Sequence, residues 1–299
     1  MEYTRLLRRG MSGADVRYMK DALLRLGYLN KSTHDSFGDD TFAAVKAFQR
    51  SNRDLSGKRL IVDGVIGERT WAAITRALSA EPGEPGNPEE IPPNIGTGAA
   101  EAISAALTGV SEERKRIVLL ALSFAYDPAA ARDYPYSLYI RGGNLYNTDL
   151  ALNVIDSQRI EAGAKRQPQY YSGGSKQMML AAVKQYPGQI TGADCSGGIV
   201  GLLRKFELVK PTFDAIANGL CDSGHSRKIS KADMIPGDWV GLSGHIGLYA
   251  GGGYVVEWYG QNFGCALTKL GTKRKAWDFV GKRYRTRAEW TKYRRPKYY

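Results

Sequence analysis

The sequence predicts an α+β protein of two domains, a small helical domain followed by a larger one in which helices pack on an antiparallel sheet. Three observations predict this arrangement. A Pro-, Gly- and Glu-rich stretch interrupts the 299-residue chain near residue 80, a helix-start motif occurs twice before it, and two alternating apolar runs flank a glycine-rich turn after it. The composition, 43% hydrophobic and 24% charged, is typical of a packed protein and not of a disordered one.

An internal repeat predicts helices in the N-terminal part of the chain. Residues 38–45 and 67–74 share the pattern Gly-x-x-Thr-aromatic-Ala-Ala-aliphatic, 29 residues apart. In both segments the apolar positions recur at intervals of three and four, as on the buried face of a helix. An earlier helix is indicated by Ser12, which can cap its start, by Asp15 in its first turn and by Gly27 at its end. We therefore expect a three-helix domain before residue 79.

A spacer separates this domain from the rest. Residues 79–98 contain five Pro, four Gly and four Glu but no Lys or Arg, a composition that cannot bury a core. We assign residues 1–78 to the first domain, 79–100 to the linker and 101–299 to the second domain.

Positive charge is concentrated at the C-terminal end. The chain carries a net charge of +12, and about +10 of it lies in residues 269–299. Such a segment attracts polyanions, of which nucleic acid and the anionic polymers of a bacterial envelope are two candidates. A solvated face that keeps the protein soluble is the third interpretation.

One cysteine has the surroundings of a reactive thiol. The chain has three cysteines, too few and too scattered for a disulfide framework or a zinc cluster. Asp194 and Ser196 suit the N-terminus of a helix, and the apolar run after Gly198 continues that helix, so Cys195 lies in its first turn. There the unpaired amides and the helix dipole favour the thiolate. Taken alone, the motif leaves open whether Cys195 is a nucleophile or a packing thiol.

A candidate base lies in a predicted β-hairpin. Two β-rich runs, 245–250 and 254–258, flank three glycines. With residue 250 opposite residue 254, His245 and Glu257 lie diagonally adjacent on one face. A carboxylate beside a histidine fixes its tautomer and makes it a better acceptor for a thiol proton. A satisfied strand histidine is the alternative interpretation.

The N-terminal pattern resembles the peptidoglycan-binding domain of cell-wall hydrolases over about residues 6–78. The resemblance is carried by residues 10–16, 26–29, 37–38, 48–49 and 63–67.

The second domain resembles the NlpC-type cell-wall cysteine peptidases over about residues 112–290. The resemblance is carried by Asp-Cys-Ser-Gly at 194–197, Pro-Gly-Asp at 236–238 and the Gly-His-Ile-Gly-Leu-Tyr run that starts at residue 244. It implies a papain-like fold in which Cys195 is the nucleophile and His245 the general base, later the acid that protonates the leaving amine. The third polar residue of that family, usually a histidine, falls on Glu257, and Gln261 takes the role if the strand ends early.

The same resemblance implies a substrate site around the cysteine. Asp194 and Ser196 flank the nucleophile, and a tyrosine hydroxyl forms the oxyanion hole with the amide of Cys195. The family pattern Tyr-x-x-Gly-Gly fits both Tyr139 and Tyr170, and we prefer Tyr139 because its segment predicts a strand that leads into a turn. The segment after Gly174 is expected to be an inserted helix.

The resemblances together imply a peptidoglycan hydrolase that cleaves an amide of the stem peptide, most often between γ-D-glutamate and the diamino acid. No cofactor or metal is expected. Peptidoglycan is the expected partner, with anionic wall polymers favoured over nucleic acid for the basic C-terminal segment. The first residues lack a signal-peptide pattern, and no apolar run could span a membrane, so we expect a bacteriophage endolysin made in the host cytoplasm. A secreted autolysin that lacks its leader is the alternative source.

Three other functions remain open at this point. They are an N-acetylmuramoyl-L-alanine amidase, a binding protein without catalysis, and a zinc hydrolase that uses Cys221, His225 and His245. One expectation concerns the third residue: Glu257→Gln should lower turnover with little change in the fold, because only the imidazole orientation is lost.

Overall fold

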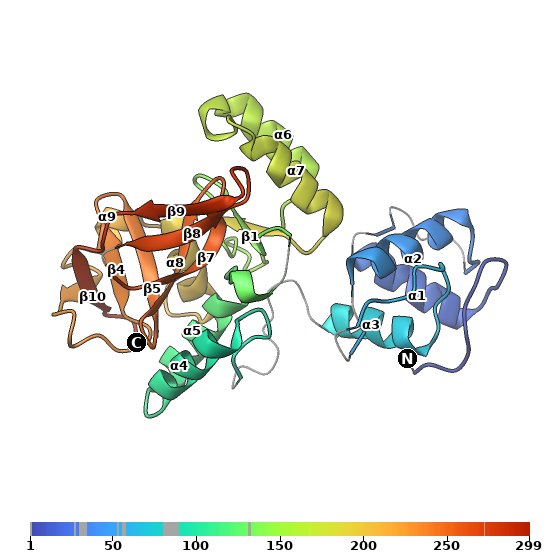
Figure 1. Cartoon of the computed structure of the whole chain (residues 1–299), viewed down its shortest axis with the longest axis horizontal. Coiled ribbons are helices and arrows are strands. Elements are labelled where there is room, and N and C mark those ends of the chain that lie inside the picture. Colours follow the sequence, from blue (N-terminus) through green and yellow to red (C-terminus); the bar gives the residue numbers. More distant parts are fainter. Residues whose placement is uncertain are drawn as a thin grey trace. The chain divides into compact units, whose positions relative to one another are not determined.

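The computed structural model covers the whole chain and describes residues 2–26, 28–29, 35–52, 54–55, 58–79, 90–130, 133–271 and 273–299 (Figure 1). It divides into two compact units, Met1–Glu81 with Val183–Gln189, and Pro82–Ala182 with Ile190–Tyr299. Residues 80–89 of the predicted linker lie outside the described residues. Its last residues, from Thr97 onward, belong to a helix.

The first unit contains the three predicted helices, α1 (Ala14–Arg25), α2 (Asp39–Ser51) and α3 (Glu68–Ser79). Their apolar faces close one core, in which Phe48 and Ile74 are fully buried. The predicted role of Ser12 as the cap of α1 is wrong, since Gly13 occupies that position without a side-chain cap. The predicted end of this helix at Gly27 lies outside the described residues.

The second unit mixes helices with a mainly antiparallel sheet. Its helical elements include α4 (Thr97–Leu107), α5 (Glu112–Phe124), the 3-10 turn η1 (Pro128–Ala130), α6 (Ser157–Arg166), the 3-10 turn η2 (Pro168–Tyr170), α7 (Ser175–Gln185), α8 (Cys195–Lys205) and α9 (Ala217–Leu220). Its strands include β1 (Ser137–Tyr139), β2 (Thr191–Ala193), β3 (Ser226–Lys228), β4 (Trp239–Leu242), β5 (His245–Gly251), β6 (Tyr254–Gly260), β7 (Gly264–Lys269), β8 (Arg274–Asp278), β9 (Arg283–Arg287) and β10 (Lys292–Pro296).

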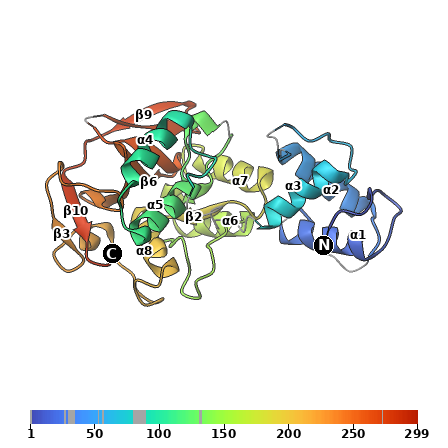
Figure 2. The same ribbon diagram turned by 90° about the horizontal axis from the view of Figure 1, so that it is seen from below.

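Six strands form the main sheet in the order β3-β10-β4-β5-β6-β7, with every neighbouring pair antiparallel. Helices α4, α5 and α8 pack against its central strands, and the view from below shows α4 and α5 in front of the sheet (Figure 2). Leu248 of β5 and Trp258 of β6 lie in the core cluster that the helices close. The prediction of a mixed fold with a helical N-terminal domain is confirmed.

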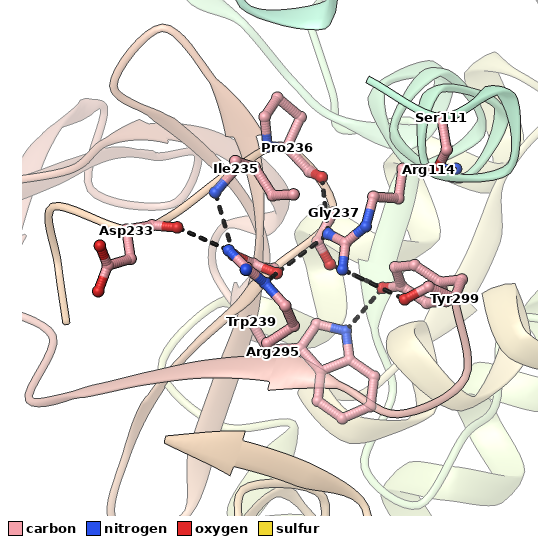
Figure 3. Close-up of polar contacts among 10 residues, drawn as sticks. Ser111, Arg114, Asp233, Ile235, Pro236, Gly237, Trp239, Arg295 and Tyr299 are labelled. Carbon is pink, nitrogen blue, oxygen red and sulfur yellow. Dashed lines mark hydrogen bonds and ion pairs between the residues drawn. The ribbon is translucent and has the colours of Figure 1, made fainter. Parts of the chain in front are cut away.

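A buried ion network ties α5 to the sheet. Asp238, fully buried, accepts hydrogen bonds from Arg114 Nη1 at 3.0 Å and from Arg295 Nη2 at 2.8 Å. Figure 3 shows the Arg114 side chain reaching from α5 toward Pro236 and Tyr299. Because two guanidinium groups share one carboxylate away from water, this cluster fixes the turn that precedes β4.

The basic C-terminal segment is folded into strands and is only partly a solvated tail. Arg274 is buried, Arg295 pairs with Asp238, and Arg294 donates to the hydroxyl of Ser226 at 3.0 Å. The charge count of residues 269–299 therefore overstates the charge that is available to a polyanion. Among the described residues, no helix is both long and apolar enough to span a bilayer.

Candidate active site

Cys195 is the first residue of α8, as the sequence predicts. Asp194 is the N-cap, and its Oδ1 accepts the amide of Gly197 at 2.8 Å and the hydroxyl of Ser196 at 3.0 Å. The following glycines let the helix approach its neighbours closely. A Cβ on Gly197 would lie 1.9 Å from the carbonyl oxygen of Gly143.

The parallel pair β1–β2 brings Tyr139 to this helix start. Tyr139 pairs with Ala193, two residues before the cysteine. The Tyr-x-x-Gly-Gly segment then turns over Asp194, whose Oδ2 accepts the amide of Gly142 at 2.8 Å. The Tyr139 side chain is in hydrogen-bonding contact with Cys195, and burial together with the nearby thiol raises the pKa of the phenol. Tyr139 therefore stays a neutral donor beside the sulfur.

The hairpin β5–β6 places the imidazole as predicted. Leu248 lies opposite Val256, as the predicted register requires, but the predicted pairing of residue 250 with residue 254 is wrong, because a bulge shifts the register and Tyr254 lies opposite Gly251. His245 Nε2 and Glu257 Oε2 are 2.7 Å apart. The Cys195 thiol lies close enough to His245 to raise the pKa of the imidazole, and its hydrogen bond, 3.8 Å long, goes to the carbonyl oxygen of Gly244. Since Glu257 occupies Nε2, the other ring nitrogen, Nδ1, remains for the thiol.

Glu257 is buried as a carboxylate. Burial raises its pKa, but the hydrogen bond and attraction to His245, the charge of Arg274 and the hydrogen bond from Thr268 outweigh it and lower the pKa. Arg274 Nη1 pairs with Oε2, and Thr268 Oγ1 donates to Oε1 at 2.6 Å. Both carboxylate oxygens of Glu257 accept hydrogen bonds, so the side chain holds a fixed position behind the imidazole.

The imidazole itself is held in place and charged. Burial lowers the pKa of His245, but hydrogen bonds to Cys195 and Glu257, with the carboxylate charge, raise it to about 9. The Trp290 ring stacks on the imidazole at 5.3 Å and an interplanar angle of 6°. The Arg274 guanidinium lies over Trp290, 4.0 Å from the ring centroid. An imidazolium next to a thiol favours transfer of the thiol proton to nitrogen.

His245 borders a cleft of about 360 Å³. Tyr139, Gly244, Gln261 and Arg287 also line this cleft. Cys195 is 5% exposed and is not among the lining residues, but it lies next to Tyr139 and Gly244. The sulfur therefore lies directly behind the wall of the cleft.

The structure separates the alternatives that the sequence left open. Tyr170 is not among the residues that line this cleft; its ring stacks under Arg141 at 4.5 Å. Gln261 lines the cleft, but it is Glu257 that accepts the hydrogen bond from His245. Asp194 and Ser196, predicted to bind substrate, are used in capping α8.

The zinc alternative is not supported by the side-chain geometry. His225 Nδ1 hydrogen-bonds the hydroxyl of Tyr298. In the described part of the chain, no group of three or more His, Cys, Asp or Glu side chains is placed to hold a metal ion.

Three residues of the site were missed by the sequence reasoning, namely Thr268, Arg274 and Trp290. In the sequence, Arg274 contributed only to the positive charge of residues 269–299. All three residues follow the β5–β6 hairpin in the sequence. Thr268 reaches it because β7 pairs with β6, Arg274 is the first residue of β8, and Trp290 lies in the segment before β10. Thr268 is paired with Val255, so extension of the predicted hairpin by one more strand is the signal that could have found it.

Comparison with known proteins supports the N-terminal assignment. Residues 12–74 match the family model of a peptidoglycan binding domain. Residues 12–74 are thus similar to a peptidoglycan-binding domain, which supports peptidoglycan as the partner of the first unit. No curated protein and no solved structure matches the chain.

Proposed function

We propose that the second unit is a cysteine peptidase with a papain-like arrangement, which hydrolyses an amide bond in the peptidoglycan stem peptide. The observation that carries the proposal is the contact of Cys195, in the first turn of α8, with His245, which is in turn hydrogen-bonded to Glu257. The match of residues 12–74 supports a wall polymer as substrate.

In the proposed reaction the Cys195 thiolate attacks the amide carbonyl and forms a tetrahedral intermediate. The Cys195 amide and the Tyr139 hydroxyl donate to its oxyanion. The His245 imidazolium protonates the leaving amine, and an acyl-enzyme forms. The neutral imidazole then takes a proton from water, which attacks the thioester and releases the acid.

The favoured bond is the one between γ-D-glutamate and the diamino acid, as the sequence resemblance implies. Hydrolysis at the lactyl amide, the N-acetylmuramoyl-L-alanine amidase reaction, is the second candidate and uses the same residues. Mass spectrometry of fragments released from purified walls separates the two, since only the amidase frees the lactyl carboxylate of muramic acid.

The biological setting that fits this pair of domains is lysis of a bacterial host by a phage endolysin. In this proposal the protein is made in the host cytoplasm and acts on the wall once the membrane is permeable. Tethering by the first unit would raise the local concentration of bonds for the second.

The test is the loss of turbidity of purified walls with the full chain and two cysteine variants. Cys195→Ala should abolish lysis while wall binding persists, because only the nucleophile is removed. Cys221→Ala, a matched change at another buried cysteine, should retain lysis. Lysis by Cys195→Ala at the wild-type rate would overturn the proposal and leave a wall-binding protein without this catalysis.

A further inference from the structure

A second groove, distinct from the catalytic cleft, lies on the other side of β8. Alternate residues of this strand point to opposite sides: Arg274 is buried toward Glu257, while Lys275 is exposed and Trp277 is half-buried. The outward side, with the start of α4 and the segment around η1, encloses about 510 Å³.

Aromatic rings form much of this groove. Trp277 pairs with Tyr284 across β8–β9, with ring centroids 5.3 Å apart in an edge-to-face arrangement, and Tyr284 is 53% exposed. Tyr126 forms a buried part of the lining, and Tyr254 lies beside it at the start of β6. The exposed Tyr284 ring and the half-buried Trp277 ring offer flat apolar surfaces with polar edges, which suit the faces of sugar rings.

Positive charge lines the same groove. Lys269, Lys273 and Lys275 are all exposed and all border it. Among the residues that the structure describes, none of the three forms an ion pair. The acidic residue of the groove, Asp127, accepts the amides of Gly96 at 3.0 Å and Ala129 at 3.0 Å, and its single negative charge is outnumbered by the three lysines. The lysines are therefore available to an anionic ligand.

We propose that this groove binds a wall polymer that carries both phosphate groups and sugar units. The rings of Trp277 and Tyr284 would pack on sugars, and the lysine ammonium groups would pair with phosphates as point charges. A sugar phosphate is favoured over nucleic acid because the same chain carries a peptidoglycan-binding domain, so its partner lies in the wall. This inference goes beyond the proposed hydrolysis and does not depend on it.

The test is calorimetric titration of full-length protein that carries Cys195→Ala with poly(glycerol phosphate) bearing glucosyl groups. Trp277→Ala should weaken binding about tenfold, the loss expected for one stacked ring. Lys273→Gln with Lys275→Gln should also weaken it and lower the slope of log K against log salt by about one to two. The matched control, Lys165→Gln with Lys210→Gln, removes the same charge from exposed positions outside the groove and should change little.

Three outcomes would overturn the inference. They are no binding of the polymer, an equal loss in the control variant, or tighter groove-dependent binding of a single-stranded oligonucleotide of equal charge. Binding to peptidoglycan stripped of phosphate polymer should be unaffected by the groove variants, because it rests on the first unit. Circular dichroism of each variant verifies that the fold is intact, and the lysine pair keeps the test valid if Trp277→Ala does not fold.

Discussion

At the scale of single residues, the charge state of His245 makes a prediction about pH. Its pKa is raised from 6.5 to about 9, so the imidazolium persists through neutral pH and is lost as the pH rises through about 9. Hydrolysis of a soluble muropeptide, measured as kcat/KM between pH 6 and 10, should therefore hold to about pH 8 and fall around pH 9. A fall centred near pH 6.5 would show that the imidazole is not held by its neighbours.

The same shift has a consequence for stability. A group whose pKa is raised on folding stabilises the protein fully below its unfolded value and loses that effect as the pH rises through its folded value. The contribution of His245 should thus disappear between about pH 6.5 and 9. Thermal unfolding of the unsubstituted chain and of His245→Gln should show this pH dependence only in the protein that keeps the histidine.

The contacts of Glu257 change what its substitution is expected to do. The sequence alone suggested that Glu257→Gln would leave the fold intact. Because Arg274 is buried against this carboxylate, the substitution leaves a buried cation unpaired and should destabilise the second unit by about 3–5 kcal/mol. The unfolding midpoint in urea measures this loss.

A double variant separates the structural from the positioning role of Glu257. Glu257→Gln with Arg274→Met removes both charges and should recover much of the lost stability, while kcat stays low because His245 has lost its carboxylate. Recovery of kcat together with stability would contradict the positioning role.

At the scale of elements, the Arg114–Asp238–Arg295 cluster should dominate the attachment of α5 to the sheet. Asp238→Asn leaves two guanidinium groups without their shared charge and should cost about 3 kcal/mol or more in unfolding free energy. Asp233→Asn, at an exposed position nearby, should stay within about 0.5 kcal/mol. Equal effects of the two substitutions in urea unfolding would refute the role given to this cluster.

Elements set by local chemistry could be predicted from the sequence, and the partners of buried charge could not. The start of α8 follows from Asp194 and the glycines after Cys195, and the His245–Glu257 pair follows from alternation across one tight hairpin. Arg274 and Trp290 depend on how later strands return to the hairpin, which no local pattern encodes. For that reason Arg274, which belongs to the site, was assigned from the sequence to the basic C-terminal segment.

At the scale of the whole molecule, each unit has its own hydrophobic core, so substitutions in one should leave the chemistry of the other intact. Phe48 is fully buried in the first unit, and Phe48→Ala should destabilise that unit by about 3–5 kcal/mol. We expect the full-length variant to lose wall binding and wall lysis but to hydrolyse a soluble muropeptide at the wild-type rate. Loss of soluble-peptide hydrolysis would show that the units do not act independently.

The most direct test of the account is the position at which a limiting amount of iodoacetamide reacts at neutral pH, found by peptide mass spectrometry of the full chain. All three cysteines are buried, and burial raises the pKa of Cys221 and of Cys265, so their thiols should react slowly. The account predicts that the label appears on Cys195 and that hydrolysis falls in proportion to labelling. Labelling of Cys221 in preference to Cys195, or full hydrolysis by protein labelled at Cys195, would contradict it.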